Sequence, residues 1–170
     1  MQNRTTKSRR PFVAKPQRGR NKWHIRISIR DQLLTLCRGG DIVRSYPISS
    51  SRFGLGTKEG SKKTPLGRFK IVEKIGDNMP QGTIFRSRVA LGPAEPLPET
   101  EDLITSRILW LDGLDHDNAN TKERFIYIHG TKHEDRIGRP DSHGCIRMRN
   151  EDVIDLFNRV EEGTQVLIAE

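Results

Sequence analysis

The segments IYIHGT at residues 126–131 and SHGCIRM at residues 142–148 decide the fold and the chemistry of this chain. The first is an apolar run typical of a strand, and it delivers His129 near its end. The second places Cys145 sixteen positions further along, among small and polar residues. Turn-forming residues let the chain fold back between the two, namely Gly138, Pro140 and Gly144. The sequence therefore predicts a thiol and a base that meet from separate segments.

This pair of side chains suits nucleophilic catalysis. A cysteine attacks as the thiolate, and an ordinary thiol needs a base or a positive neighbour to lose its proton near neutral pH. His129 can take that proton from Cys145 and later return one to the leaving group. The second ring nitrogen of the histidine needs an acceptor, and a backbone carbonyl near Gly130 can serve, because no carboxylate has an obvious spacing.

The residues next to the thiol can supply the rest of such a site. The consecutive backbone amides of His143, Gly144 and Cys145 can donate to the oxyanion of a tetrahedral intermediate. Gly144 permits the tight turn that aims these amides inward. Arg147 can hold a substrate carboxylate or lower the pKa of the thiol.

A zinc site is the competing chemical hypothesis. Four side chains near the site are possible ligands, His129, His133, His143 and Cys145. Their spacing matches neither a Cys-x-x-Cys nor a His-Glu-x-x-His pattern, so we favour the cysteine nucleophile. The bland alternative is a buried structural cysteine and a hydrogen-bonded histidine at the end of a strand.

The composition predicts one soluble domain with a basic arm. The chain has 170 residues and a net charge of +8, and residues 1–22 carry eight Lys and Arg with no acidic residue. The remainder, from residue 23 to residue 170, is therefore close to neutral. A basic arm can bind nucleic acid or an anionic surface, but its polar, aperiodic sequence favours a solvated, disordered tail.

The sequence shows no stretch of about twenty apolar residues that could span a membrane and no apolar signal-peptide region near its start. Taken literally, these features predict a cytosolic protein. One of its two cysteines, Cys37, lies in a strand-like run and is expected to be a small buried residue. A disulfide with Cys145 is possible by count alone.

The hydrophobic pattern predicts a mainly β domain with one helix in its C-terminal half and long loops. Alternating residues favour seven or eight strands, near 24–29, 33–37, 42–48, 68–74, 88–91, 104–111, 124–129 and 164–168. The first three form an antiparallel meander, and Trp110 is expected to anchor the core. The helix is predicted to begin with Asn150 as its N-cap and to end at Gly163.

The same residues resemble the signature of the L,D-transpeptidase catalytic domain, the YkuD family. His129-Gly130-Thr131 and the 142–148 segment carry the resemblance. Three further stretches are similar to the family pattern, the turn TPLGRF at 64–69, the strands at 108–111 and 127–129, and the closing Gly-Thr-x-Val at 163–166. The resemblance spans residues 25–169.

The resemblance implies a sandwich-like β-barrel with a helix packed beside it. It implies that Cys145 is the nucleophile, that His129 is its base, and that the Gly130 carbonyl orients the imidazole. Four more residues would build the pocket, Ser142, His143, Gly144 and Arg147. In this family the thiolate attacks a peptidoglycan stem peptide after its third residue, usually diaminopimelic acid. The terminal D-alanine leaves, and carbapenems are the usual acylating inhibitors.

Three outcomes follow from the implied thioester. Transfer to an amine of a second stem gives a 3→3 cross-link, water gives an L,D-carboxypeptidase, and other amines give D-amino-acid exchange or protein anchoring. No metal or organic cofactor is implied. The resemblance implies a cell-envelope or periplasmic location, whereas the absence of a recognisable signal peptide leaves a cytoplasmic one open. The alternative from another class is a non-catalytic wall- or polyanion-binding protein. The oligomeric state has no signal in the sequence.

Overall fold

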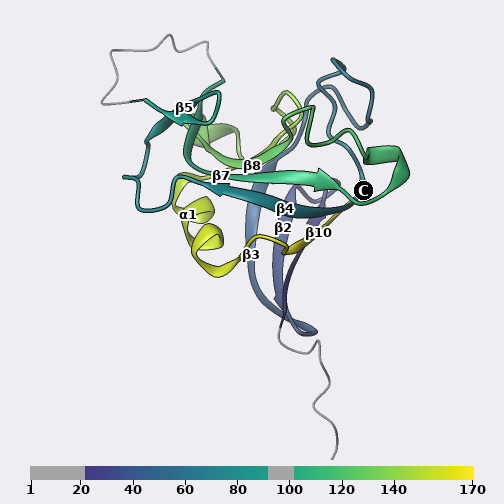
Figure 1. Cartoon of the computed structure of the whole chain (residues 1–170), viewed down its shortest axis with the longest axis horizontal. Helices are drawn as coiled ribbons and strands as arrows, with labels where there is room; N and C mark the ends of the chain where they lie inside the picture. The colour runs from purple at the N-terminus through teal and green to yellow at the C-terminus, as the bar shows by residue number, and fades with distance from the viewer. Residues whose placement is uncertain (1–21, 92–101) are drawn as a thin grey trace, which may run out of the picture.

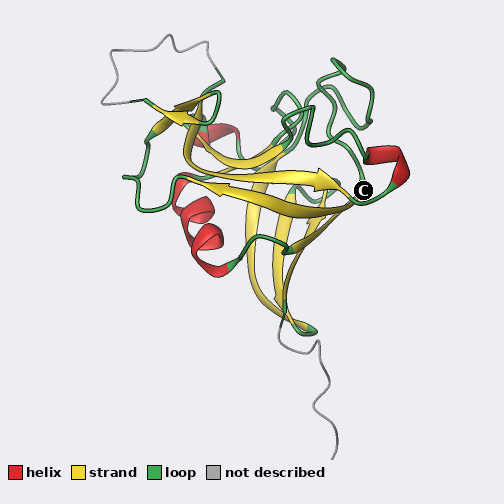
Figure 2. Cartoon of the chain, in the orientation of Figure 1, coloured by secondary structure: helices red, strands yellow, loops and turns green. Residues whose placement is uncertain are grey.

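The computed structural model describes residues 22–91 and 102–170, and strands dominate this part of the chain (Figure 2). Its strands are β1 (Trp23–Ser28), β2 (Leu33–Arg38), β3 (Asp41–Ser49), β4 (Gly67–Ile75), β5 (Ile84–Arg86), β6 (Val89–Ala90), β7 (Ile104–Gly113), β8 (Tyr127–Thr131), β9 (Ile146–Met148) and β10 (Gln165–Ala169). The α-helix is α1 (Asn150–Arg159), and two short 3₁₀ turns are η1 (His116–Asn118) and η2 (Glu134–Arg136). The mainly β prediction is confirmed.

The strands form one sheet that closes into a barrel. Their order is β4-β10-β1-β2-β3-β9-β8-β7, and β4 also pairs with β7, so the first and last of these eight strands meet. The hairpin β5–β6 extends the sheet from β7. Among the described strands, the β1–β10 and β8–β9 pairs are parallel, and the others are antiparallel. Closure leaves few open edges in the sheet.

Alternating side chains fill the barrel, as the sequence pattern predicts. On β1, Ile25 and Ile27 are buried, and on β2 Leu34 and Leu36 are buried beside them. The antiparallel β1–β2–β3 meander is confirmed. A smaller apolar cluster lies apart from this core and contains Phe85, Ile108 and Tyr127, with Cys145 packed against it.

Helix α1 packs against β7 and β8 and turns its apolar side to the core (Figure 1). Val153, Leu156 and Phe157 are buried on that side. The predicted helix boundaries were wrong by a few residues, because Arg149 is the N-cap and the helix ends at Arg159. Its final carbonyls accept hydrogen bonds from Lys74, whose Nζ lies 2.7 Å from the oxygens of Phe157 and Val160.

Two of the ten described strands escaped the sequence analysis. Strands β5 and β9 have three residues each, which is too short for a periodic pattern. The strand expected at 124–129 instead begins at Tyr127 and continues to Thr131, because Phe125 adopts a left-handed conformation with φ of +55°. The predicted disordered arm at 1–22 lies outside the described residues except for Lys22, and residues 92–101 lie outside them too.

Both cysteines are free in the structure. Cys37 is buried in β2, as predicted, with 3% of its surface exposed. Among the described residues, we find no helix with the length and apolar character that a membrane crossing requires.

Candidate active site

Strands β8 and β9 bring the predicted base and nucleophile to one face of the sheet. The parallel register pairs Ile128 with Ile146 and His129 with Arg147. One residue before Ile128 and Ile146, the N–H of Tyr127 donates to Sγ of Cys145 at 3.3 Å. Because paired residues in neighbouring strands point to the same side, about 4.8 Å apart, Cys145 lies diagonally across from His129.

The Cys145 side chain is partly exposed, and its thiol is hydrogen-bonded. It donates to the carbonyl oxygen of Phe125 at 3.4 Å and packs against the smaller apolar cluster. Burial raises the pKa of the thiol to about 12, and the Tyr127 N–H and the charges of Arg147 and Arg124 offset this only in part. The thiol is therefore protonated at neutral pH, so it needs a base to become a nucleophile.

His129 is placed to be that base. Its ring is 2% exposed, and Nδ1 lies 2.7 Å from the carbonyl oxygen of Gly130. A carbonyl only accepts, so Nδ1 carries the proton and Nε2 presents a lone pair. Burial lowers the pKa of His129, although the negative charge of Asp102 and the bond to Gly130 raise it. The resting pair is thus a neutral thiol and a neutral imidazole.

Gly130 and Asn150 fix the strand that carries this histidine. A Cβ on residue 130 would lie 2.5 Å from the Thr105 carbonyl oxygen and 2.8 Å from Oδ1 of Asn150. That Oδ1 accepts hydrogen bonds from the hydroxyls of Thr105 and Ser106, and Nδ2 of Asn150 donates to the Thr131 carbonyl. Asn150, predicted only as a helix cap, therefore links α1 to β7 and β8 behind the site.

Ser142 and Gly144 form the turn that leads into Cys145. Ser142 is fully buried, and its Oγ donates to the Cys145 carbonyl at 2.6 Å and accepts from the Gly144 N–H at 3.2 Å. The Gly144 amide thus has an acceptor within the protein, and Ser142 has no exposed surface, so both residues shape the turn; their contact with substrate stays a prediction. The amides of His143 and Cys145 remain as candidate oxyanion donors. The Gly144 carbonyl accepts from Thr64 at 2.9 Å, which ties the predicted 64–69 turn to the site.

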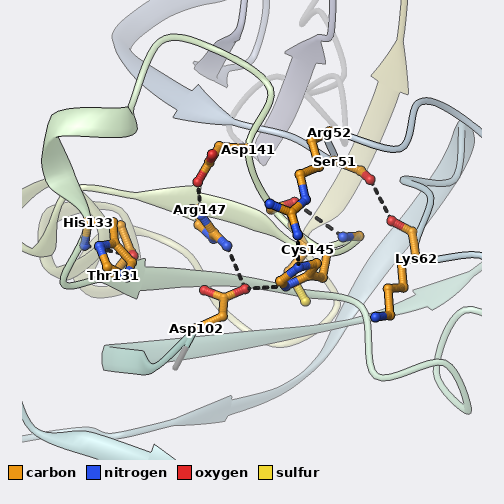
Figure 3. A network of polar contacts seen from close by, with 12 residues as sticks. Ser51, Arg52, Lys62, Asp102, Thr131, His133, Asp141, Cys145 and Arg147 are labelled. Carbon is orange, nitrogen blue, oxygen red and sulfur yellow. Dashed lines mark hydrogen bonds and ion pairs between the residues drawn. The ribbon is translucent and has the colours of Figure 1, made fainter. Parts of the chain in front are cut away.

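Arg147 is held by two carboxylates of the protein itself. Its side chain is 3% exposed and lies between Asp102, at 2.5 Å, and Asp141, at 2.7 Å (Figure 3). Arg147 therefore has carboxylate partners within the protein, and its charge lowers the pKa of Cys145, the second of the two roles expected for it; its contact with a substrate carboxylate stays a prediction. Burial opposes the charge of Asp102, but His129 and Arg147 together keep the pKa of this carboxyl below its usual value.

His143 lies between Asp102 and Arg52. Its Nδ1 is 3.1 Å from the Asp102 carboxylate, and its Nε2 is 2.9 Å from the Arg52 guanidinium. Arginine only donates and a carboxylate only accepts, so Nδ1 carries the proton and the ring is neutral. The ring also stacks on Phe53 at 5.7 Å. Asp102 was missed because it lies 27 positions before His129, with no motif around it.

The side chains proposed as zinc ligands do not form a metal site. Within residues 22–91 and 102–170, no three His, Cys, Asp or Glu side chains form a group that could hold a metal ion. His143 is engaged by Asp102 and Arg52. His133 lies at the start of η2, where its backbone N–H donates to Thr131.

Trp110 borders the thiol instead of filling the core. Its indole is only partly buried and stacks on Phe125 at 5.8 Å, with Tyr127 edge-on at 5.6 Å. These two neighbours are the residues whose backbone atoms contact Cys145. Trp110 thus packs against the smaller apolar cluster and not inside the main core, and its ring forms a wall with Phe125 and Tyr127, whose backbone atoms contact the nucleophile.

Comparison with known proteins identifies the family of this chain. Residues 22–168 match the model of the YkuD family, described as the L,D-transpeptidase catalytic domain. YkuD of Bacillus subtilis (strain 168), a relative named as an L,D-transpeptidase, is 30% identical over 146 residues, which are 86% of this chain and 65% of that protein. YqjB of the same organism, with the same kind of name, is 44% identical over 120 residues, or 69% of this chain and 58% of that protein.

The solved structures support the fold. An L,D-transpeptidase from Mycobacterium smegmatis superposes with a TM-score of 0.59 at 17% identity, covering 88% of this chain and 59% of that one. At this identity the likeness establishes the barrel and not the chemistry. The chain spans less than two thirds of the length of the two curated relatives.

Proposed function

Because the chain belongs to the YkuD family of L,D-transpeptidase catalytic domains, we propose that it is a cysteine-dependent L,D-transpeptidase that acts on peptidoglycan stem peptides. One observation carries the proposal. On one face of the β8–β9 pair, the partly buried Cys145 thiol lies diagonally across from His129, whose imidazole carries its proton on the nitrogen that faces Gly130. This arrangement leaves Nε2 of His129 as the base.

In the first half-reaction, Sγ of Cys145 attacks the carbonyl carbon after the third residue of a tetrapeptide stem while Nε2 of His129 takes the thiol proton. The amides of His143 and Cys145 donate to the oxyanion of the tetrahedral intermediate. The imidazolium then protonates the nitrogen of the terminal D-alanine. As the carbon–nitrogen bond breaks, D-alanine leaves and a thioester to Cys145 remains.

In the second half-reaction, an amine of another stem attacks the thioester carbonyl and His129 takes the proton of the attacking nitrogen. The carbon–sulfur bond breaks, the thiolate recovers a proton from the imidazolium, and a 3→3 cross-link is released. Water in place of the amine gives an L,D-carboxypeptidase with the same donor. Both outcomes share the thioester, so the acceptor is decided by what reaches Cys145 after acylation.

The charges around the pair favour proton transfer during attack. Both resting groups are neutral because burial disfavours their charged forms. The Asp102 carboxylate favours the imidazolium that appears as the thiol is consumed. We therefore expect His129 to act as a general base in the acylation step, without a stable thiolate beforehand.

Intact-mass spectrometry tests the proposal. The protein is incubated with a tetrapeptide-stem muropeptide, and separately with a carbapenem. We expect an adduct on Cys145 with each, release of D-alanine from the peptide, and no adduct in Cys145→Ala. The absence of both adducts in folded, reduced protein would refute the proposal and favour a non-catalytic wall- or polyanion-binding protein. The second products then separate cross-linked dimer from trimmed tripeptide.

The substrate also suggests a location. Peptidoglycan stems are found in the cell envelope, so we propose that the protein acts there, with cytoplasmic action on recycled peptides as the alternative. Fractionation of cells that carry an epitope-tagged full chain tests this. Recovery in the cytoplasmic fraction alone would overturn the envelope location.

A further inference from the structure

We propose that Arg88 binds a carboxylate of the peptide substrate beside the Cys145 thiol and thereby selects substrates that carry one. The inference rests on the proposed function for the identity of the peptide. Its own basis is the aromatic wall next to the thiol, which consists of Trp110, Phe125 and Tyr127.

The guanidinium of Arg88 lies over this wall. Its central carbon is 4.7 Å from the Trp110 ring centre and 5.0 Å from that of Phe125. One nitrogen donates to the Tyr127 hydroxyl at 3.1 Å. These contacts hold the guanidinium beside the rings, and the group carries five N–H donors, more than the Tyr127 contact uses. A planar fork with free donors is suited to a carboxylate.

Left-handed backbone holds both sides of this contact in place. Ser87 and Arg88 form the two-residue turn of the β5–β6 hairpin, with φ of +48° and +67°. Phe125 has φ of +55° and is 49% exposed, although its carbonyl contacts the thiol. Left-handed backbone is costly for a bulky residue and is often retained where geometry serves a site. The Ser87–Arg88 values are those that a two-residue hairpin turn requires, so the turn fixes the position of Arg88, whereas the left-handed Phe125 is the residue whose conformation is costly.

Among the described residues, the positive charge at the wall has no direct ion-pair partner. Neither Arg88 nor Lys122, whose Nζ lies 5.6 Å from the Trp110 ring centre, is within 4.0 Å of an acidic side chain in that part of the chain. Glu73 pairs with Trp110 between β4 and β7 and acts on Tyr127 through its charge without forming an ion pair with Arg88. Arg68 and Arg159, in contrast, are paired directly with aspartates. A cation without a direct carboxylate partner beside a reactive thiol can bind an anionic ligand.

Binding to the unreactive Cys145→Ala protein tests the inference separately from the chemistry. The probe is a tetrapeptide stem with diaminopimelate at its third position and D-alanine at its fourth. Two analogues carry a carboxamide in place of one carboxylate, either at the D-alanine terminus or on the diaminopimelate side chain. Fluorescence of Trp110 reports binding after Trp23→Phe removes the one other tryptophan.

We expect one of the two amidations to weaken binding by about 10- to 100-fold, the range of a charge-assisted hydrogen bond, and so to identify the carboxylate. In the Arg88→Met variant, the same amidation should leave the binding affinity almost unchanged. Lys122→Met is the matched control, because it removes a charge from the same ring without removing the fork, and it should keep most of the penalty. Arg88→Lys keeps the positive charge but not the planar set of N–H donors, so most of the affinity penalty of amidation should disappear in this variant.

The inference fails if Arg88→Met and Arg88→Lys keep the full amidation penalty, if Lys122→Met abolishes it equally, or if the parent tetrapeptide does not bind. Binding with this pattern but no acylation of the native thiol would instead refute only the proposed function. Thermal unfolding of each variant confirms that the barrel is intact, and the comparison between peptides within one variant cancels a general loss of structure.

Discussion

Replacement of Asp102 by Asn tests whether the charges behind the site act on the catalytic pair. Arg147 is 3% exposed and is shared by Asp102 and Asp141. Complete removal of a buried partner costs about 3–5 kcal/mol. Since one partner remains, we expect Asp102→Asn to lower the free energy of unfolding by about 2 kcal/mol, which corresponds to a Tm about 4–8 °C lower for a domain of this size.

Asp141→Asn is the matched control. It removes the other carboxylate of the same arginine, so it should destabilise the protein by a similar amount. Only Asp102 acts on the catalytic pair, because its charge raises the pKa of both His129 and Cys145. Its removal lowers both pKa values, so the rate of Cys145 alkylation by iodoacetamide should rise at a lower pH in Asp102→Asn than in the parent.

Peptide mapping assigns the alkylated residue, and urea denaturation measures stability at one fixed pH. We expect both variants to be destabilised and only Asp102→Asn to shift the alkylation profile. An equal shift in Asp141→Asn would show that loss of packing, and not charge, moves the profile. An unshifted Asp102→Asn would refute the electrostatic reasoning.

Three further predictions use the same preparation. Gly130→Ala should lower the free energy of unfolding by about 1–3 kcal/mol and abolish acylation, since its Cβ would meet Thr105 and Asn150; acylation at the parent rate would contradict the close approach. Asn150→Ala should lower the free energy of unfolding, measured by urea denaturation, by about 2–4 kcal/mol, because the hydroxyls of Thr105 and Ser106 lose their acceptor. Asn158→Ala, at an exposed position of the same helix, should change it by less than about 0.5 kcal/mol. Alkylation of Cys145 should still accelerate above pH 9, as a pKa of about 12 requires, while buried Cys37 should react only after unfolding; a plateau below pH 9 would show that the thiol is not desolvated.

The sequence predicts best where one residue type has one physical role. The alternation in β1 and β2 and the apolar side of α1 were visible because burial repeats along the chain. The Cys145 and His129 pair was visible because its motif is contiguous. The contact between His129 and Gly130 follows from the strand itself, since the acceptor is the next residue.

What the sequence did not predict depends on contacts between distant segments. Asp102 reaches the site only because β7 pairs with β8, and Arg147 changes from a candidate substrate ligand to a buried ion pair once two aspartates close on it. Ser142 is a polar residue of a type common in binding sites, but the turn buries it. Trp110 is a large aromatic residue of the kind that often fills a core, yet its position in β7 places it against the same small apolar cluster as the Cys145 thiol.

The three-residue strand β9 has a consequence for how this protein folds. It joins β3 through two residue pairs and β8 through three, so it is the seam between the N-terminal meander and the β7–β8 half of the barrel. The β8–β9 pair that aligns nucleophile and base joins residues 18 positions apart, but the β3–β9 pair that holds β9 on its other side joins residues about a hundred positions apart. Such a late, non-local step should make acylation of Cys145 by substrate appear together with global folding and not before it. A nascent or partly unfolded chain would then not acylate its substrate until the barrel is complete, although its solvated thiol would still react with alkylating reagents.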